Sequence, residues 1–244
     1  MRSKSDRADL AASPPRFVYF DLDDTLLDHS AAEREALRDV ALELLGLGND
    51  SPIIEQLQHA YHDRNRDLWA DYAARRITKD ELRRKRFEHI ADTFATAATW
   101  TELDSFYMNR YADHWRPVDG ALSLFEWVAD RYPVGIITNG FASTQHAKLD
   151  RFPMIREVSR AVIISEEVGH LKPDRRLFLH AEQAAGERGD SILYVGDSLR
   201  SDVEGALAAG WRAAWFTERE VPVGLAANVF AFRKWREFQQ YLAG

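Results

Sequence analysis

The fold of this chain is decided by residues 17–25, FVYFDLDDT. The first four of these residues are apolar and β-forming and do not alternate with polar residues, so they predict a strand buried on both faces. Asp21 and Asp23 follow at its end, and side chains two apart on an extended chain point the same way. Two neighbouring carboxylates repel unless a cation or a proton lies between them. The pattern suits a metal-assisted nucleophile beside a general acid/base, and the alternative is an acidic turn without function.

Four later runs of apolar, β-forming residues share this character, and each is followed by a polar turn and a helical pattern. They are Val134–Ile137, Ala161–Ile164, Ile192–Val195 and Ala213–Phe216. Strands that alternate with helices in this way are typical of a parallel sheet covered by helices on both faces. We therefore expect an α/β protein with a Rossmann-like parallel sheet core.

A long interval with a different pattern separates the first two strands. It reads as successive helices without a strand: apolar residues near Leu37 repeat at helical spacing, and Thr78 with Glu81 has the spacing of a capping box. The sequence therefore predicts an all-helical insert in an α/β domain. The predicted division is a disordered tail at residues 1–15, a core domain at 16–28 and 114–244, and a helical cap domain at 29–113.

Polar residues follow two more of the predicted strands. Thr138, Asn139 and Gly140 come after the second strand, and a hydroxyl with backbone N–H groups at a helix start can hold a phosphate. A simple strand-to-helix turn is the alternative. Lys172 precedes a helix that begins near Pro173, where its ammonium can neutralise an anion. The alternative is a solvated lysine before a proline-started helix.

A last acidic group follows the strand Ile192–Val195. Asp197 stands directly after the strand and Asp202 one turn further on. Hard oxygen ligands at a strand end suit Mg²⁺, which takes few carboxylates and keeps several waters. Otherwise Asp197 is a loop residue and Asp202 serves the helix N-terminus. Because ligands bind at the carboxyl ends of strands in open α/β sheets, we expect all four polar groups to converge.

Composition limits the classes of function. The chain has 244 residues, a net charge of −7 and no cysteine, which excludes disulfides, thiolate metal sites and cysteine nucleophiles. The acidic balance disfavours binding of a nucleic acid polymer. The N-terminal segment has no apolar stretch of a signal peptide, and no apolar run is long enough to span a bilayer. We expect a cytoplasmic protein without a membrane partner.

The ordered polar groups resemble the motifs of the haloacid dehalogenase superfamily. The matching residues are Asp21-x-Asp23-x-Thr25, Thr138, Lys172, and Gly196-Asp197 with Asp202. The resemblance covers nearly the whole chain after Arg16, and the helical insert is similar to the C1-type cap of that superfamily. It implies a core with helices on both sheet faces and a cap that selects the substrate.

The resemblance also implies roles in phosphoryl transfer. Asp21 would attack phosphorus, and Asp23 would protonate the leaving oxygen and later activate water. Thr138 and the backbone after it would hold the phosphoryl oxygens, while Lys172 offsets their charge. Dehalogenases of this superfamily lack a carboxylate at the position of Asp23, so the resemblance favours ester hydrolysis through an aspartyl-phosphate.

A magnesium site is implied in the same way. The Asp21 carboxylate, the Asp23 main-chain carbonyl and Asp197 would hold Mg²⁺. Asp202 would orient Lys172 or a metal-bound water rather than bind the ion itself. One of Glu166 and Glu167 is expected to face the site as a more distant partner of a metal-bound water.

A narrower resemblance points to the bacterial pyrimidine 5′-nucleotidase branch. It rests on residues 136–141 with Gln145, on residues 164–169, and on Lys172 with Pro173. In the helical insert, residues 68–72, Ile77, Leu82, Arg86 and Phe87 are also similar. The chain departs from that branch in its longer N-terminal tail and in His170. N-acylneuraminate phosphatases share part of the region of Thr138 to Gly140.

Three residues of the helical insert are candidates for substrate contact. Trp69 or Tyr72 could stack on a nucleobase, and the alternative is that both belong to the core of the insert. Arg86 could reach a phosphate or a base, but the run of basic residues that contains it also reads as a solvated helix face.

The sequence therefore predicts a Mg²⁺-dependent phosphatase of small phosphomonoesters, with nucleoside 5′-monophosphates as the expected substrates. Sugar or acyl-sugar phosphates are the alternative substrates, and a phosphomutase remains open. A non-catalytic phosphate-binding module is the alternative from another class, although such a module would not need the carboxylate of Asp23. The expected assembly is a monomer or a homodimer.

Overall fold

A computed structural model describes residues 13–222 and 224–244. Its contacts divide the chain into a core unit, which contains the residues up to Asp28 and Pro117–Gly244, and a helical unit, His29–Arg116. Most of the predicted tail at residues 1–15 lies outside the described residues. Within the described part of it, the carbonyl of Ser13 accepts a hydrogen bond of 2.9 Å from Arg212.

The core unit is built on a six-stranded sheet in the order β3-β2-β1-β4-β5-β6. All neighbouring strands are parallel, which confirms the expected α/β class. The strand order reverses between β1 and β4: β2 and β3 lie on one side of β1, and β4, β5 and β6 lie on the other. The strands are β1 Phe17–Phe20, β2 Val134–Thr138, β3 Ser159–Ile164, β4 Ile192–Gly196, β5 Arg212–Phe216 and β6 Val229–Phe232.

The sixth strand was not predicted from the sequence. β6 is only four residues long, and among the described residues no helix stands between β5 and β6. It pairs with β5 through Ala213–Val229 and Phe216–Phe232, at the edge of the sheet. Pairing with a neighbouring strand therefore specifies this element, rather than a local sequence signal.

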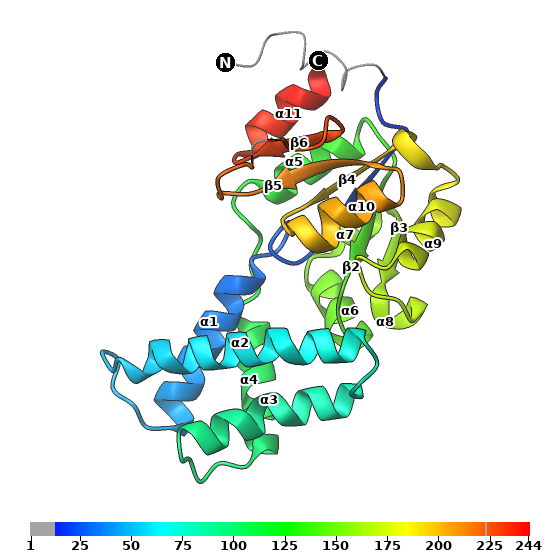
Figure 1. The fold of residues 1–244 in the computed structure, drawn as a ribbon. Coiled ribbons are helices and arrows are strands. Elements are labelled where there is room, and N and C mark those ends of the chain that lie inside the picture. Colours follow the sequence, from blue (N-terminus) through cyan, green and yellow to red (C-terminus); the bar gives the residue numbers. More distant parts are fainter. Residues whose placement is uncertain (1–12, 223) are drawn as a thin grey trace. The chain divides into compact units, whose positions relative to one another are not determined.

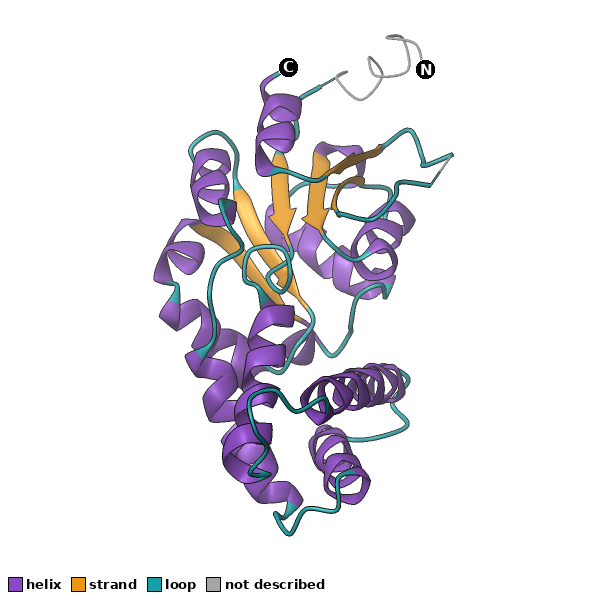
Figure 2. Ribbon diagram, turned by 90° about the vertical axis from the view of Figure 1, so that its left-hand side faces the viewer, coloured by secondary structure: helices purple, strands orange, loops and turns teal. Residues whose placement is uncertain are grey.

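Helices cover both faces of the sheet (Figures 1 and 2). Because side chains alternate along a strand, Val18 and Phe20 enter one apolar cluster, whereas Phe17 and Tyr19 enter the other. The first cluster contains residues of α5, α6, α7 and α11, and the second contains residues of α9, η4 and α10. The helices of this unit are α5 Ala121–Ala129, α6 Ala142–Arg151, α7 Pro153–Val158, α8 Ser165–Val168, α9 Arg175–Ala185, η3 Gly189–Ser191, η4 Leu199–Glu204, α10 Gly205–Ala208 and α11 Trp235–Ala243.

The helical unit has its own apolar core, which includes Leu37, Leu57, Phe87 and Leu103. The predicted capping box of Thr78 is confirmed, and Thr99 begins α4 with a second one. Such caps satisfy backbone N–H groups that have no partner within the helix. The helices are α1 His29–Asp39, its π-helical continuation η2 Val40–Leu44, α2 Ile53–Ala73, α3 Lys79–Thr93 and α4 Trp100–Asp113.

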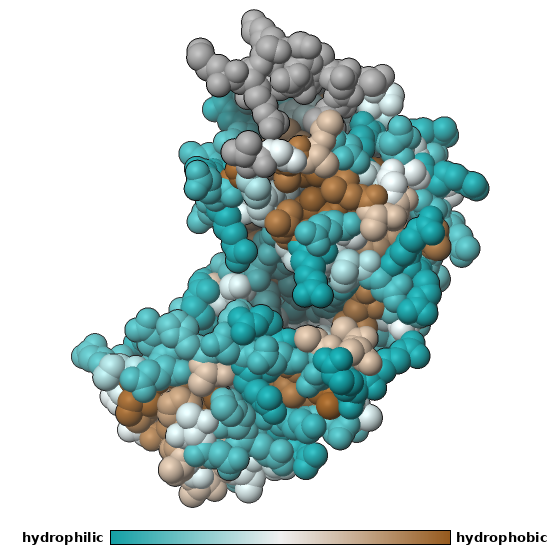
Figure 3. All heavy atoms as spheres, in the orientation of Figure 1, coloured by the Kyte–Doolittle hydropathy of each residue, from teal (hydrophilic) through white to brown (hydrophobic). Residues whose placement is uncertain are grey.

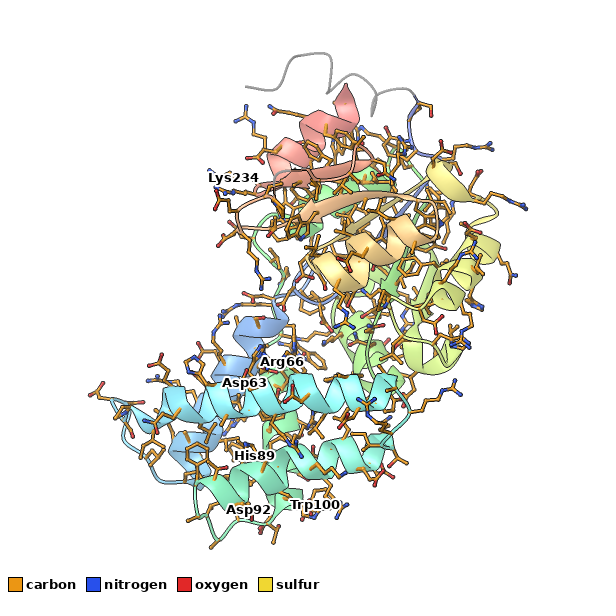
Figure 4. The ribbon with its side chains drawn as sticks, viewed as in Figure 1. Asp63, Arg66, His89, Asp92, Trp100 and Lys234 are labelled. Carbon is orange, nitrogen blue, oxygen red and sulfur yellow. The ribbon has the colours of Figure 1, made fainter. Side chains whose placement is uncertain are left out.

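Charged side chains cover the outer surface of the helical unit. Asp63 and Arg66 lie on α2, and His89 and Asp92 lie on α3 (Figure 4). Asp63 and Arg66 form an ion pair of 3.0 Å, but their side chains are 65% and 64% exposed, so it contributes little to stability. Hydrophilic residues also dominate the face of this unit in Figure 3. No helix among the described residues is long and apolar enough to cross a membrane.

Candidate active site

The carboxyl end of β1 places Asp21 inside the core unit. Its backbone N–H continues the sheet by donating to the carbonyl of Val195, at 2.8 Å. One carboxylate oxygen, Oδ1, accepts a hydrogen bond of 2.8 Å from the backbone N–H of Leu22. The side chain is only 10% exposed, so it is held away from bulk water. Asp24 then turns the chain with a φ of 58°, a conformation that aspartate tolerates better than most residues.

Lys172 connects two of the predicted carboxylates. Its Nζ lies 2.7 Å from Oδ1 of Asp21 and 2.8 Å from Oδ1 of Asp202. It also donates to the hydroxyl of Tyr194 at 2.9 Å, and that hydroxyl donates to the carbonyl of Ile137. These contacts occupy the three donors of an ammonium and fix its position. The sequence singled out Lys172, but it contained no sign that Tyr194 of β4 would orient it.

The acidic residues of the site strongly perturb one another. Burial raises the pKa of Asp21 well above its ordinary value; the charge of Lys172 opposes this, and Asp202 and Asp197 add to it. Burial, together with Asp202 and Asp24, raises the pKa of Asp197 to about 7. Burial alone would lower the pKa of Lys172, but Asp202 and Asp21 outweigh it and raise that pKa. The carboxylates of the site therefore carry more negative charge than the ammonium of Lys172 can neutralise.

A divalent cation fits this group of residues. Asp21, Asp197 and Asp202 each offer an oxygen within 4.8 Å of the others. Both oxygens of Asp202 are already engaged, one by Lys172 and the other by the backbone N–H of Ser198 at 2.9 Å. The Asp197 carboxylate accepts a long hydrogen bond of 3.5 Å from the hydroxyl of Thr25. The free coordination capacity therefore lies mainly on Asp21 and Asp197.

Gly196 explains how Asp202 comes so close to the end of β4. A Cβ atom at this position would lie closer to Oδ2 of Asp202 than real Cβ atoms approach. Only glycine leaves room for that carboxylate to reach Ser198 and Lys172. The glycine next to Asp197 thus serves the packing of Asp202.

The structure assigns Asn139 and Gly140 to the framework of the site. The Asn139 side chain donates to the carbonyl of Lys172 at 3.1 Å and accepts from its N–H at 2.8 Å. The N–H of Gly140 donates to the hydroxyl of Ser165 at 3.1 Å. Asn139 therefore clamps the loop after β2 to the backbone that carries Lys172. We expected both residues to hold phosphate, and in this arrangement the Gly140 N–H is engaged elsewhere.

Thr138 keeps a hydroxyl suited to an anion. Its Oγ1 accepts a hydrogen bond of 2.6 Å from Nε2 of Gln145. A hydroxyl that accepts still has its own proton to donate. The side chain is fully buried at the end of β2, the strand adjacent to β1.

Asp23 is held by two side chains of α6 that we did not assign to the site. Nζ of Lys148 lies 2.6 Å from Oδ1 of Asp23, and Nε2 of Gln145 lies 3.0 Å from Oδ2. Gln145 and Lys148 are three residues apart, so they share one face of the helix. The spacing of three residues between Gln145 and Lys148, in the helix that follows Thr138, is the sequence signal that could have identified them. Helix α6 begins with the Ala142 N–H donating to Glu166 at 2.7 Å. The expected role of Glu166 or Glu167 as a partner of a metal-bound water stays a prediction.

Arg86 lies in the interior of the helical unit, which corrects both sequence interpretations. It is 6% exposed, and its guanidinium donates to Oδ1 of Asp104 at 3.1 Å. It also lies over the rings of Tyr61, Phe87 and Tyr107. Arg86 is therefore neither part of a solvated face nor presented to a substrate. Removal of Arg86 alone would leave the buried carboxylate of Asp104 without this partner, which is costly in the interior of the unit.

Trp69 and Tyr72 do not belong to the aromatic core of the helical unit. Both are half-buried on α2, and their rings meet edge to face with centroids 5.6 Å apart. The core aromatics of this unit are instead Tyr61, Phe87, Tyr107 and Tyr111. The alternative that Trp69 and Tyr72 are core residues is thus wrong, and their role in binding a base stays a prediction.

Comparison with known proteins places these observations in a family. Residues 15–210 match the model of the haloacid dehalogenase-like hydrolases. The chain is 32% identical to the pyrimidine 5′-nucleotidase YjjG of Escherichia coli over 213 residues, which are 86% of this chain and 90% of the relative. It is 31% identical to the pyrimidine 5′-nucleotidase PynA of Streptococcus pneumoniae over 203 residues, 82% of this chain and 83% of the relative.

A solved structure shows the same fold. The HAD-hydrolase YfnB of Bacillus subtilis, bound to magnesium, superposes with a TM-score of 0.77 at 27% identity and covers 94% of this chain and 99% of its own. The family model spans the strand that ends in Asp21 as well as the segments that carry Thr138, Lys172 and Asp202. The chain therefore belongs to the haloacid dehalogenase-like hydrolase family.

Proposed function

We propose that this chain is a Mg²⁺-dependent phosphatase of small phosphomonoesters that works through an aspartyl-phosphate on Asp21. The observation that carries the proposal is the buried pair of Asp21 and Lys172, 2.7 Å apart at the carboxyl end of the central strand. A carboxylate held by a cation can approach an anionic phosphate with less repulsion. The nucleotidase relatives support a phosphorylated substrate.

Asp21, Asp197 and the main-chain carbonyl of Asp23 would hold the Mg²⁺ ion. The mutual approach of Asp21, Asp197 and Asp202 within 4.8 Å supports a cation here, as does the magnesium bound to the neighbouring structure. When bound, Mg²⁺ supplies positive charge that offsets the repulsion between the carboxylates and the phosphate. Asp202 stays with Lys172 and Ser198 and holds the lysine in place.

The residues of this chain then divide the reaction between them. A carboxylate oxygen of Asp21 forms a bond to phosphorus while the bond from phosphorus to the ester oxygen breaks. Asp23 gives its proton to that leaving oxygen and, as a carboxylate, next takes a proton from water. The resulting hydroxide attacks phosphorus, the bond to Asp21 breaks, and inorganic phosphate leaves. The hydroxyl of Thr138 donates a hydrogen bond to a phosphoryl oxygen, and the ammonium of Lys172 offsets the charge of the phosphate.

The proposal is tested by the substitution Asp21→Asn with 4-nitrophenyl phosphate as substrate. The wild-type protein should release phosphate from this ester when Mg²⁺ is present. It should release none when EDTA removes the ion. The kcat of the variant should be at least about a thousandfold lower than that of the wild type, because an amide cannot form the phosphorylated intermediate. Asp174→Asn is a matched control, since Asp174 caps α9 and contacts Arg176. Wild-type turnover by Asp21→Asn would overturn the mechanism.

The helical unit is proposed as the cap that selects the substrate, with nucleoside 5′-monophosphates as the preferred class. The support is the nucleotidase relatives, which cover this unit as well as the core, and the half-buried pair Trp69 and Tyr72. Aromatic side chains outside a core can stack on a nucleobase, which contributes about 1–3 kcal/mol per base.

A panel of phosphates tests this choice of substrate. Pyrimidine and purine nucleoside 5′-monophosphates, ribose 5-phosphate and an acyl-sugar phosphate would be compared by kcat/KM. Nucleotides should exceed ribose 5-phosphate, and Trp69→Leu should remove much of that difference while leaving ribose 5-phosphate unchanged. Equal kcat/KM values for nucleotides and ribose 5-phosphate would reject the nucleotidase assignment but not the phosphatase mechanism.

A further inference from the structure

Helix α6 reaches both carboxylate oxygens of Asp23. Lys148 donates to Oδ1 at 2.6 Å, and Gln145 donates to Oδ2 at 3.0 Å. The first contact has the short length of a charge-assisted hydrogen bond. Two donors on the two oxygens fix the plane of the carboxyl group as well as its distance.

The geometry around α6 maintains this arrangement. The N-terminus of the helix is capped by Glu166, and the side chain of Gln145 folds back over Gly140. A Cβ atom at Gly140 would lie 2.8 Å from three atoms of the Gln145 side chain. Thus glycine at this position leaves the amide free to lie between Thr138 and Asp23.

The ammonium of Lys148 meets Asp23 in a buried environment. Its side chain is 2% exposed, whereas that of Asp23 is 22% exposed. A buried ammonium is costly unless it is paired, and breaking such a pair costs more than breaking an exposed one. The charge of Lys172 is directed to Asp21 and Asp202, so Asp23 has a cation of its own. The nucleophile and the acid/base are therefore supported by different lysines.

We propose that Lys148, assisted by Gln145, is the positioning residue of the acid/base: it holds the Asp23 carboxyl group in the orientation from which a proton passes to the leaving oxygen. The inference rests on the proposed phosphatase function and deepens it. Lys148 acts through Asp23 and forms no bond to the substrate. The chemical step is unchanged: the bond from phosphorus to the ester oxygen breaks, and the electron pair left on that oxygen takes the proton of Asp23.

A comparison of esters with different leaving groups distinguishes a positioning role of Lys148 from a role in the stability of the fold. An alkoxide leaves only with a proton, whereas 4-nitrophenolate leaves without one. Benzyl phosphate and 4-nitrophenyl phosphate are similar in size and differ in this respect. The quantity kcat/KM reports the first phosphoryl transfer, so it follows the departure of the leaving group.

The test compares kcat/KM for both esters in the wild-type protein and in Lys148→Met, with Mg²⁺ present. General acid catalysis contributes about 10²–10⁴-fold, so the variant should lose on the order of 10–100-fold with benzyl phosphate. The loss with 4-nitrophenyl phosphate should stay below about threefold, since that step needs no proton. Lys148→Arg keeps the charge and should recover most of the benzyl phosphate activity.

Two further variants make the result decisive. Arg151→Met removes an exposed cation one turn further along α6 and should change neither rate. Gln145→Met should reproduce the selective loss in weaker form, which keeps the test informative if Lys148→Met does not fold. Equal losses on both esters, or an increase in KM alone, would overturn the positioning role. A wild-type protein that hydrolyses neither ester, or an Asp21→Asn variant that hydrolyses both, would instead reject the proposed function.

Discussion

Nζ of Lys172 lies 2.7 Å from Oδ1 of Asp21 inside the core unit. The same ammonium also contacts Asp202, so two buried carboxylates share one cation. Removal of one member of a buried ion pair leaves the other charge without a partner, which costs more than the pair itself contributes. The integrity of the core unit and the proposed chemistry therefore depend on one residue.

Lys172→Met should lower the free energy of unfolding by about 3–5 kcal/mol near neutral pH in EDTA, because Asp21 and Asp202 lose their counter-charge. Urea unfolding followed by circular dichroism measures the change. Lys234→Met is the control: Lys234 is exposed at the start of α11 (Figure 4), and its loss should change stability by less than about 0.5 kcal/mol. Equal stability of Lys172→Met and wild type would contradict the prediction.

Stabilisation by Mg²⁺ should increase with pH through the neutral range. The pKa of Asp197 is raised to about 7 in the folded, metal-free protein, first by burial and then by Asp202 and Asp24. The pKa of an aspartate in an unfolded chain is about 3.9. At pH values between the unfolded and the folded pKa, folding is therefore accompanied by the uptake of a proton on Asp197. Without bound metal, the stability that this proton uptake by Asp197 contributes is fully present below about pH 4. It is lost as the pH rises through about 7.

Because a metal ligand must be deprotonated, Mg²⁺ has to displace that proton at low pH. The increase in Tm on addition of Mg²⁺ should therefore be larger at about pH 8 than at about pH 5.5. Differential scanning fluorimetry at both pH values, with and without the ion, measures it. Asp197→Asn should abolish most of the increase at both. A Mg²⁺ effect that is the same at the two pH values in wild type would show that Asp197 does not bind the ion.

Arg86 should matter for the stability of the helical unit rather than for substrate choice. Arg86→Met leaves the buried Asp104 with only the partly exposed Arg83, so we expect a loss of about 3 kcal/mol. Replacement of both partners, Arg86→Met with Asp104→Leu, should recover most of this loss, because apolar residues of similar size can replace a buried pair. Chemical unfolding compares the three proteins.

The substrate panel supplies the second readout for Arg86. The ratio of kcat/KM for a nucleotide to that for ribose 5-phosphate should be the same in the double variant and in wild type. A double variant that is stable but has lost its preference among substrates would show that Arg86 contacts the ligand after all.

The sequence determined much of this protein by local rules. Unbroken apolar runs such as Phe17–Phe20 predicted buried parallel strands. Asp21 and Asp197 could be located because each follows such a strand, and Thr138 because it ends one. Lys172 could be located because it stands shortly before a helix. Carboxyl ends of parallel strands meet at one edge of the sheet, so proximity followed from order alone. The family resemblance rested on the same residues.

The tertiary structure alone decided which side chains support these groups. Lys148 and Gln145 reach Asp23 across more than 120 residues of sequence, and Tyr194 reaches Lys172 from β4. Arg86 looked solvated because its neighbours in sequence are basic, yet it is buried because Asp104 and three aromatic rings surround it. Periodicity reports which residue types recur along a chain, whereas the partner of a buried charge depends on packing between distant segments. The sequence thus determined the fold and the groups proposed to react, and three-dimensional packing determined how those groups are held.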